Sequence, residues 1–373
     1  MRVVHVVSTM ESAHNYVDLV AELTGAGIDV HVLLGNAEPT PVETDLSDAG
    51  AEVVRLGLRL HDFGSALRAA PRVRSEVRRR RPSIVHGHFL GGSIAAAWAS
   101  IALPSARFIH TRHHADFHHE HARKGVAFDR MVNRLSEHIV AISPVVEEVL
   151  RDREGVAAGR VSVIEHGVRV ERYRDVVDRD VAAFRRRVGL EGPGPVVGVC
   201  SRMINGKGCD VIIDAMKGVW ASVPDARLLW LNARGPLAPG LRTELGGDER
   251  VRLVEFEHDM AAAFAAMDVF VHIPTRRTAE AFGFVYAEAM ASGVPCVFTE
   301  AGAIAGRLTD GVHAHLVGHR DAEVTATAVL GLLGDPDHAR QVAHAGRSVA
   351  DERFTVVREA AEHARLYGQL LGA

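Results

Sequence analysis

Short β-branched runs alternate with amphipathic helical segments along the chain, and this rhythm leaves few folds open. In the first half, the runs stand at residues 2–8, 28–34, 51–57, 83–88, 106–111 and 138–143. The segments between them carry helix signals, such as Ser143 followed by Pro144, a capping residue and a residue that fits the first helical position. Such alternation predicts parallel sheets with helices on both faces.

The same rhythm starts again after a break. Residues 171–193 contain a charge-rich helical piece and the Gly/Pro cluster GLEGPGP, which is typical of a connection between domains. New β-branched runs follow at residues 195–201, 226–232, 250–256, 268–274 and 294–299. We therefore expect an α/β protein with two Rossmann-like doubly wound domains, 1–170 and 194–350, that are joined by a linker at 171–193 and face each other across a cleft.

Composition excludes several classes of protein. A formal net charge of -4 argues against a dedicated nucleic-acid binder, which normally carries a basic excess. Three scattered cysteines are too few for a disulfide framework or a cysteine zinc site. The N-terminal apolar run is shorter than a signal peptide needs, and no run reaches the roughly 18 apolar residues of a membrane span. We expect a soluble, cytoplasmic protein.

The loop SRMINGKGCDVII, residues 201–213, follows one of the predicted strands and leads into a helix. Arg202 and Lys207 offer cations, and Gly206 and Gly208 permit close approach of the backbone at a helix N-terminus. This combination is typical of a diphosphate site, although neither GxxxxGK[ST] nor GxGxxG is present. The alternative is a solvated loop with two surface cations.

A second loop of this kind carries two glutamates. Glu280 follows the predicted strand at 268–274, and Glu288 falls one to two turns inside a helix that we expect to end at Gly293. Two such carboxylates could bind different parts of one polyhydroxylated ligand, while the helix N-terminus around Gly283 and Phe284 faces a phosphate. The alternative is an acid favoured by the helix dipole together with an ordinary exposed glutamate.

The spacing of Glu280 and Glu288 in EAFGFVYAEAMASGVPCV resembles the signature of the retaining glycosyltransferases of family four, which have the GT-B fold. Further motifs occur in the family's order. RMINGKG resembles its Arg and Lys loop, TRH at 111–113 its T-x-H motif, SPVVEEVL the segment after the last strand of its first domain, and IEHGVRVERY the stretch before its hinge. The resemblance extends over almost the whole chain.

The resemblance implies a transfer of sugar from a nucleotide-sugar, most commonly a UDP-sugar, to a hydroxyl acceptor without metal or cofactor. It implies that Arg202 and Lys207 hold the diphosphate, Glu280 the sugar hydroxyls and Glu288 the ribose. The residues 351–373 would form a helix that crosses back to the first domain. The implied catalytic residues are His113, Arg202, Lys207 and Glu280; the donor side adds Gly206, Phe282, Gly283, Phe284 and Glu288, and the acceptor side His113, His114 and Ser8.

The sequence departs from the family pattern in two places. The loop after the first strand, STMESAHNYVDL, lacks the family's glycine pair, which puts acceptor recognition in question. Gly306 occupies a position where the family often has glutamate, so that details of the donor loop could differ. A sugar-nucleotide epimerase on the same fold is the enzymatic alternative, and the altered loops leave a catalytically silent nucleotide-sugar binding protein open as another.

Two further features invite interpretation. His114 and His118 are four residues apart and could chelate zinc on a helix, but no carboxylate or cysteine partner is evident, and a polar acceptor-facing loop is the simpler interpretation. The basic run from Arg72 to Arg81 precedes Pro82, where it would complement the C-terminus of a helix. Its alternative is peripheral contact with an anionic membrane face, since some relatives use lipid-linked acceptors.

Overall fold

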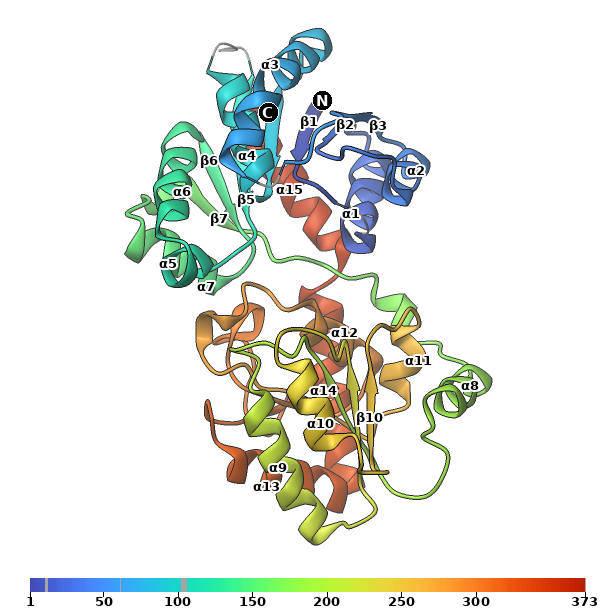
Figure 1. Ribbon diagram of the computed structural model, residues 1–373. Helices are drawn as coiled ribbons and strands as arrows, with labels where there is room; N and C mark the ends of the chain where they lie inside the picture. The colour runs from blue at the N-terminus through green and yellow to red at the C-terminus, as the bar shows by residue number, and fades with distance from the viewer. Residues whose placement is uncertain (11–12, 61, 102–105, 373) are drawn as a thin grey trace. The chain divides into compact units, whose positions relative to one another are not determined.

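The computed structural model describes residues 1–10, 13–60, 62–101 and 106–372. The chain divides into two compact units, Met1–Val168 with Thr355–Ala373, and Arg169–Phe354. Figure 1 shows that each unit is built on a β-sheet with helices packed around it. Both sheets are parallel in every strand pair of the described residues, which confirms the predicted α/β class.

The sheet of the first unit has the strand order β3-β2-β1-β4-β5-β6-β7. Its strands are β1 (Arg2–Val7), β2 (Asp29–Leu34), β3 (Glu52–Arg55), β4 (Ile84–His88), β5 (Arg107–Arg112), β6 (His138–Ala141) and β7 (Val161–Val163). Its helices are α1 (His14–Gly25), α2 (Pro41–Asp48), α3 (Phe63–Arg80), α4 (Phe89–Ser100), α5 (Phe117–His121), α6 (Arg123–Leu135), α7 (Pro144–Glu148) and α15 (Val356–Leu371). The prediction missed β7, because a three-residue strand carries little periodicity.

Both faces of this sheet are covered. In β1, Val3 and Val7 pack with apolar residues of α1, α2 and α15, whereas Val4 and Val6 pack with those of α3 and α4. All four side chains are fully buried. Because alternate residues of a strand point to opposite faces, a run of valines is what a strand buried on both sides requires.

The sheet of the second unit has the order β10-β9-β8-β11-β12-β13. Its strands are β8 (Val196–Cys200), β9 (Arg227–Leu231), β10 (Val251–Val254), β11 (Val269–His272), β12 (Cys296–Phe298) and β13 (His315–Leu316). Its helices are α8 (Asp178–Val188), α9 (Cys209–Ser222), α10 (Ala238–Leu245), α11 (Met260–Ala265), α12 (Phe284–Ser292), α13 (Ala322–Gly334) and α14 (Pro336–Arg353). The two-residue strand β13 escaped prediction for the same reason as β7.

The division between the units differs from the expected linker. The chain passes from one unit to the other between Val168 and Arg169, and residues 171–193 belong to the second unit. Phe184 of α8 is only 2% exposed, and the Arg185 side chain donates a hydrogen bond to the Ala266 carbonyl at 2.8 Å. The sequence did not predict this packing, because a single buried aromatic residue among many charged ones gives only a weak pattern of an apolar helix face.

The last helix, α15, belongs to the first unit, where it packs beside α1 (Figure 1). The buried Glu359 of α15 accepts a hydrogen bond from the Gly167 amide at 2.8 Å and contacts His166 Nδ1 at 2.7 Å. Val168 and Thr355 form a parallel bridge. The two places where the chain leaves and re-enters the first unit therefore lie side by side.

Candidate functional site

Each sheet reverses its strand order once, between β1 and β4 in the first unit and between β8 and β11 in the second. In doubly wound sheets, ligands bind at the carboxyl ends of the strands beside such a reversal. Ser8 follows β1 directly, Arg202 follows β8 after one residue, and Glu280 lies in the segment after β11. Most predicted site residues therefore lie at the ends of strands where the fold accommodates a ligand.

The loop after β8 is shaped by glycine. Gly208 precedes the first residue of α9 with a φ of 70°, and a Cβ atom at this position would lie 2.3 Å from the Ile273 carbonyl oxygen. Only glycine permits both this backbone conformation and this close approach. The loop consequently brings Lys207 against the segment that follows β11, while the Arg202 side chain is exposed to solvent.

Lys207, Glu280 and His272 form a compact cluster in the second unit. The Lys207 ammonium group is ion-paired with Glu280 Oε1, and His272 Nε2 lies 2.8 Å from the same oxygen. His272 is the last residue of β11 and is 2% exposed, and Glu280 is 9% exposed. The structure thus brings two of the predicted residues, Lys207 and Glu280, into direct contact and adds a histidine to them.

The two glutamates have opposite electrostatic environments. Burial works to raise the pKa of Glu280, but the hydrogen bond from His272 and the charge of Lys207 outweigh it and lower that pKa to about 2. Burial raises the pKa of Glu288 to about 7, against a smaller opposite effect of its hydrogen bond with Tyr173. Glu280 is therefore ionised at neutral pH, whereas Glu288 titrates there.

Helix α12 begins and ends at left-handed glycines, Gly283 and Gly293, as the sequence predicts for its C-terminus. Phe282 is buried, with its ring centroid 5.1 Å from that of the half-buried Phe284. The Phe282 carbonyl accepts a hydrogen bond from the Ala303 amide at 2.9 Å. The Phe282 side chain therefore packs inside the protein, and its backbone is tied to the segment at Ala303.

Gly306, where the sequence departs from the family pattern, lies in a turn beside Glu300. Gly306 is exposed and left-handed, with a φ of 68°, and its amide donates a hydrogen bond to Glu300 Oε1 at 2.8 Å. A carboxylate is therefore present next to this turn, on Glu300 instead of on residue 306. The sequence did not reveal Glu300 as the carboxylate beside this turn, because Glu300 lies six positions before Gly306.

In the first unit, His113 follows β5 and lies within a group of aromatic rings. Its ring stacks on Phe89 at 4.1 Å between centroids and on His166 at 5.4 Å. Burial lowers the pKa of His113 well below its ordinary value, and the neighbouring His166 adds to this effect. His113 is therefore neutral at pH 7. Phe89 has a φ of 57°, an outlier for a bulky residue of the kind that clusters at functional sites.

The loop after β1 lacks the family's glycine pair, but glycines from α4 approach it. A Cβ atom on Gly92 would lie 2.5 Å from the Val6 carbonyl oxygen, and one on Gly91 would lie 2.6 Å from the Leu60 carbonyl oxygen. The Gly92 amide donates a hydrogen bond to the Ser8 hydroxyl oxygen at 2.9 Å. Ser8 thus anchors the start of α4, a structural role besides the predicted acceptor role.

The structure supplies the carboxylate that the sequence did not reveal beside His114 and His118. Asp129 Oδ2 lies 2.6 Å from His118 Nδ1, and Asp129 Oδ1 lies 3.4 Å from His114 Nε2. Arg112 also contacts Asp129 Oδ2, at 3.0 Å, and pairs with the buried Glu154 at 2.6 Å. The Arg112 guanidinium group already compensates the negative charge of Asp129. The cluster of His114, His118 and Asp129 is therefore a hydrogen-bonded network that does not require a metal cation.

A second set of histidines that could hold a metal ion lies in the first unit. The ligand atoms of His5, His86 and His88 lie within 4.8 Å of one another. Two of these histidines contact phenol groups, since His5 Nδ1 is 2.8 Å from the Tyr16 hydroxyl and His86 Nδ1 is 2.7 Å from the Tyr367 hydroxyl. These contacts satisfy His5 and His86 as polar groups of the core. His88 Nδ1 lies 3.3 Å from His113 Nε2, and the buried Nε2 atom of His88 has no hydrogen-bond partner among the described residues.

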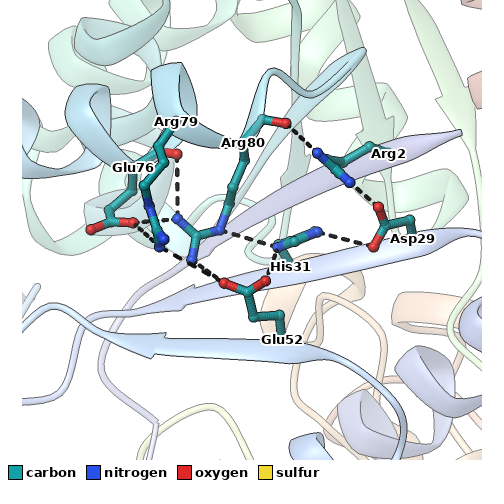
Figure 2. A network of polar contacts seen from close by, with 7 residues as sticks. All are labelled: Arg2, Asp29, His31, Glu52, Glu76, Arg79 and Arg80. Atoms are coloured by element: carbon teal, nitrogen blue, oxygen red, sulfur yellow. Dashed lines mark hydrogen bonds and ion pairs between the residues drawn. The ribbon is translucent and has the colours of Figure 1, made fainter.

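The basic run from Arg72 to Arg81 is largely used within the protein. Arg72 donates to the Leu56 carbonyl at 2.7 Å. Arg80 is buried, is ion-paired with Glu52 and Glu76, and lies 3.1 Å from His31 (Figure 2). Helix α3 ends at Arg80, before Pro82, as predicted. Within the described part of the chain, no helix has the length and apolarity to cross a membrane.

Solved structures with the same fold include that of Anabaena Alr3699/HepE in complex with UDP-glucose. Its TM-score against this chain is 0.81, with 20% sequence identity and coverage of 99% of this chain and 100% of that one. The structure of sucrose-phosphate synthase from Thermosynechococcus elongatus gives a TM-score of 0.78, with 20% identity and full coverage of both chains. These comparisons confirm the GT-B architecture.

Curated relatives match shorter segments. A D-inositol 3-phosphate glycosyltransferase of Corynebacterium urealyticum is 26% identical over 276 residues, which are 68% of this chain and 64% of that protein. A GDP-mannose-dependent alpha-(1-6)-phosphatidylinositol monomannoside mannosyltransferase of Mycolicibacterium smegmatis is 34% identical over 215 residues, 54% of this chain and 55% of that protein. This chain therefore spans roughly half to two thirds of the length of these relatives.

Family profiles cover both units. Residues 15–172 match the profile described as Glycosyltransferase Family 4, and residues 194–335 match the profile described as Glycosyl transferases group 1. The two matches follow each other along most of the chain, one in each unit. Together with the GT-B fold and the Lys207–Glu280 cluster, they show that the chain belongs to glycosyltransferase family four.

Proposed function

We propose that this protein transfers a sugar from a nucleoside-diphosphate sugar to a hydroxyl group of an acceptor. The observation that carries the proposal is the contact of Lys207 with Glu280 at the strand reversal of the second sheet. Lys207 offers a cation for a diphosphate, and Glu280 offers a carboxylate for sugar hydroxyls. The two side chains are in contact next to the start of α9.

Four of the predicted donor residues have charges that suit a nucleotide-sugar. Lys207 and the exposed Arg202 stabilise the diphosphate, including the negative charge that develops as it leaves the sugar. Glu280 accepts hydrogen bonds from sugar hydroxyls. Glu288 accepts them from the ribose, and its pKa of about 7 makes this contact stronger as the pH rises through neutrality.

We further propose that transfer retains the anomeric configuration and needs no metal. The pKa of about 2 makes the Glu280 carboxylate too weakly basic to serve as the general base at neutral pH. The departing diphosphate is then the group that takes the proton of the acceptor hydroxyl on the same face of the sugar. His113, neutral in the first unit, orients the reacting groups by hydrogen bonding rather than by charge.

The nucleobase is proposed from two lines of support that differ. The family resemblance favours uracil, the base of UDP-sugars, and UDP-glucose is bound in the Anabaena structure. The mycolicibacterial relative is named for GDP-mannose. We take UDP-sugars as the first donors to test and GDP-mannose as the second, with inositol phosphates and glycan or lipid-linked alcohols as acceptors.

The test is nucleotide release from UDP-glucose and from GDP-mannose, with and without myo-inositol phosphate, followed by the anomeric analysis of any product. Lys207→Ala is expected to lose most turnover. Lys217→Ala is the matched control, because Lys217 lies on α9, is exposed and pairs with Asp214 on its own helix. Interconversion of the donor sugar without transfer would instead support an epimerase, and binding without any turnover a silent binding protein.

A further inference from the structure

His272 is a buried polar residue that the proposed reaction does not yet use. It ends β11, and its ring lies against Tyr286 in an edge-on arrangement with 4.8 Å between centroids. Its Nε2 atom is 2.8 Å from Glu280 Oε1. No motif pointed to His272, since a histidine within a buried strand is indistinguishable from a core residue in the sequence.

The protonation states of this pair follow from their surroundings. Burial lowers the pKa of His272, and this outweighs the opposite effect of the hydrogen bond with Glu280. A neutral imidazole next to an ionised carboxylate must donate from Nε2, so that its proton lies on the atom facing Glu280. His272 is therefore a fixed, uncharged donor to the carboxylate.

Lys207 and His272 both contact Oε1 of Glu280. We expect only one of these two contacts to remain when a nucleotide-sugar binds. If the Lys207 ammonium group moves to the diphosphate, Glu280 loses its ion pair. A buried carboxylate without any donor is strongly disfavoured, and it would take up a proton or rotate toward solvent. The hydrogen bond from His272 is the one that such a movement of Lys207 leaves in place.

We propose that His272 is a positioning residue for the donor sugar: it holds the Glu280 carboxylate ionised and oriented through Oε1, so that Oε2 accepts hydroxyl hydrogens of the sugar. This inference rests on the proposed function and names the residue that gives the sugar half of the donor its affinity. The site is closely built around Glu280, because a Cβ atom on Gly302 would lie 2.9 Å from the Glu280 Cβ.

The experiment compares the affinity for a nucleotide with that for its sugar conjugate. Calorimetry with UDP and UDP-glucose, and with GDP and GDP-mannose, measures how much the sugar adds in the wild-type protein. His272→Phe keeps an aromatic ring but removes the donor, and His272→Gln restores an N–H group in its place. His258→Gln, an exposed histidine on the same unit, is the control.

We expect His272→Phe to bind the nucleotide within about twofold of wild type and to lose roughly tenfold or more of the affinity that the sugar adds. His272→Gln should recover most of that loss, which a purely structural residue would not show. An unchanged sugar contribution in a folded His272→Phe, or a loss in both variants alike, would overturn the inference. If wild type binds no nucleotide at all, the proposed function falls together with it.

Discussion

Glu288→Gln is expected to stabilise the ligand-free protein at pH 8 and to have little effect at pH 5. Burial raises the pKa of Glu288 from its ordinary 4.5 to about 7. A carboxyl group of this kind favours folding while it is protonated, so its contribution is present below pH 4.5 and is lost as the pH rises through 7. The difference between the two pKa values corresponds to about 3 kcal/mol at most, since Glu288 is partly open to solvent.

The assay is thermal unfolding of wild type and Glu288→Gln between pH 5 and pH 8.5. For a unit of this size, 1 kcal/mol corresponds to roughly 2–4 °C, so the variant should gain up to about 10 °C over wild type at pH 8. Tyr173→Phe removes the hydrogen bond that lowers the pKa of Glu288, and should move the pH of half-effect upward. A difference between wild type and Glu288→Gln that does not change with pH would refute the reasoning.

Three substitutions test other parts of the structure. Phe184→Ala should cost about 3–5 kcal/mol in the second unit because it empties a buried site, whereas a side chain in a free linker would cost nothing measurable. Gly208→Ala should lower the melting temperature and weaken nucleotide binding because of its left-handed backbone and its contact with a carbonyl, while Gly247→Ala, with open space around it, should do neither. Glu359→Gln should cost about 1–3 kcal/mol, because one carboxylate serves both His166 and the Gly167 amide; unfolding in urea that matches wild type would contradict this role.

The fold was largely predictable because its signals are local. Strands such as β1 are runs of valine buried on both faces, and helices such as α12 end at left-handed glycines. The contact of Lys207 with Glu280 also follows from the sequence in part, since both residues follow strands that turn out to be neighbours. Strand order itself had to come from the structure.

The residues that the sequence did not reveal act through contacts between distant segments. His272 donates to Glu280 only because β11 and the loop after it fold back together, and Tyr173 reaches Glu288 from a segment more than a hundred residues earlier. Asp129 meets His118 through the packing of α5 and α6. Such partners have no periodicity or motif, so their identification requires coordinates.

The most direct test of the account is calorimetric titration of UDP and GDP into wild type, Lys207→Ala and Lys217→Ala. We predict that one nucleoside diphosphate binds wild type and Lys217→Ala equally, and that Lys207→Ala binds it at least tenfold more weakly, since the lost contact is one between an ammonium group and a phosphate. Equal affinity of all three proteins, or no binding of either nucleotide to wild type, would contradict the assignment of this cluster as the site of the donor diphosphate.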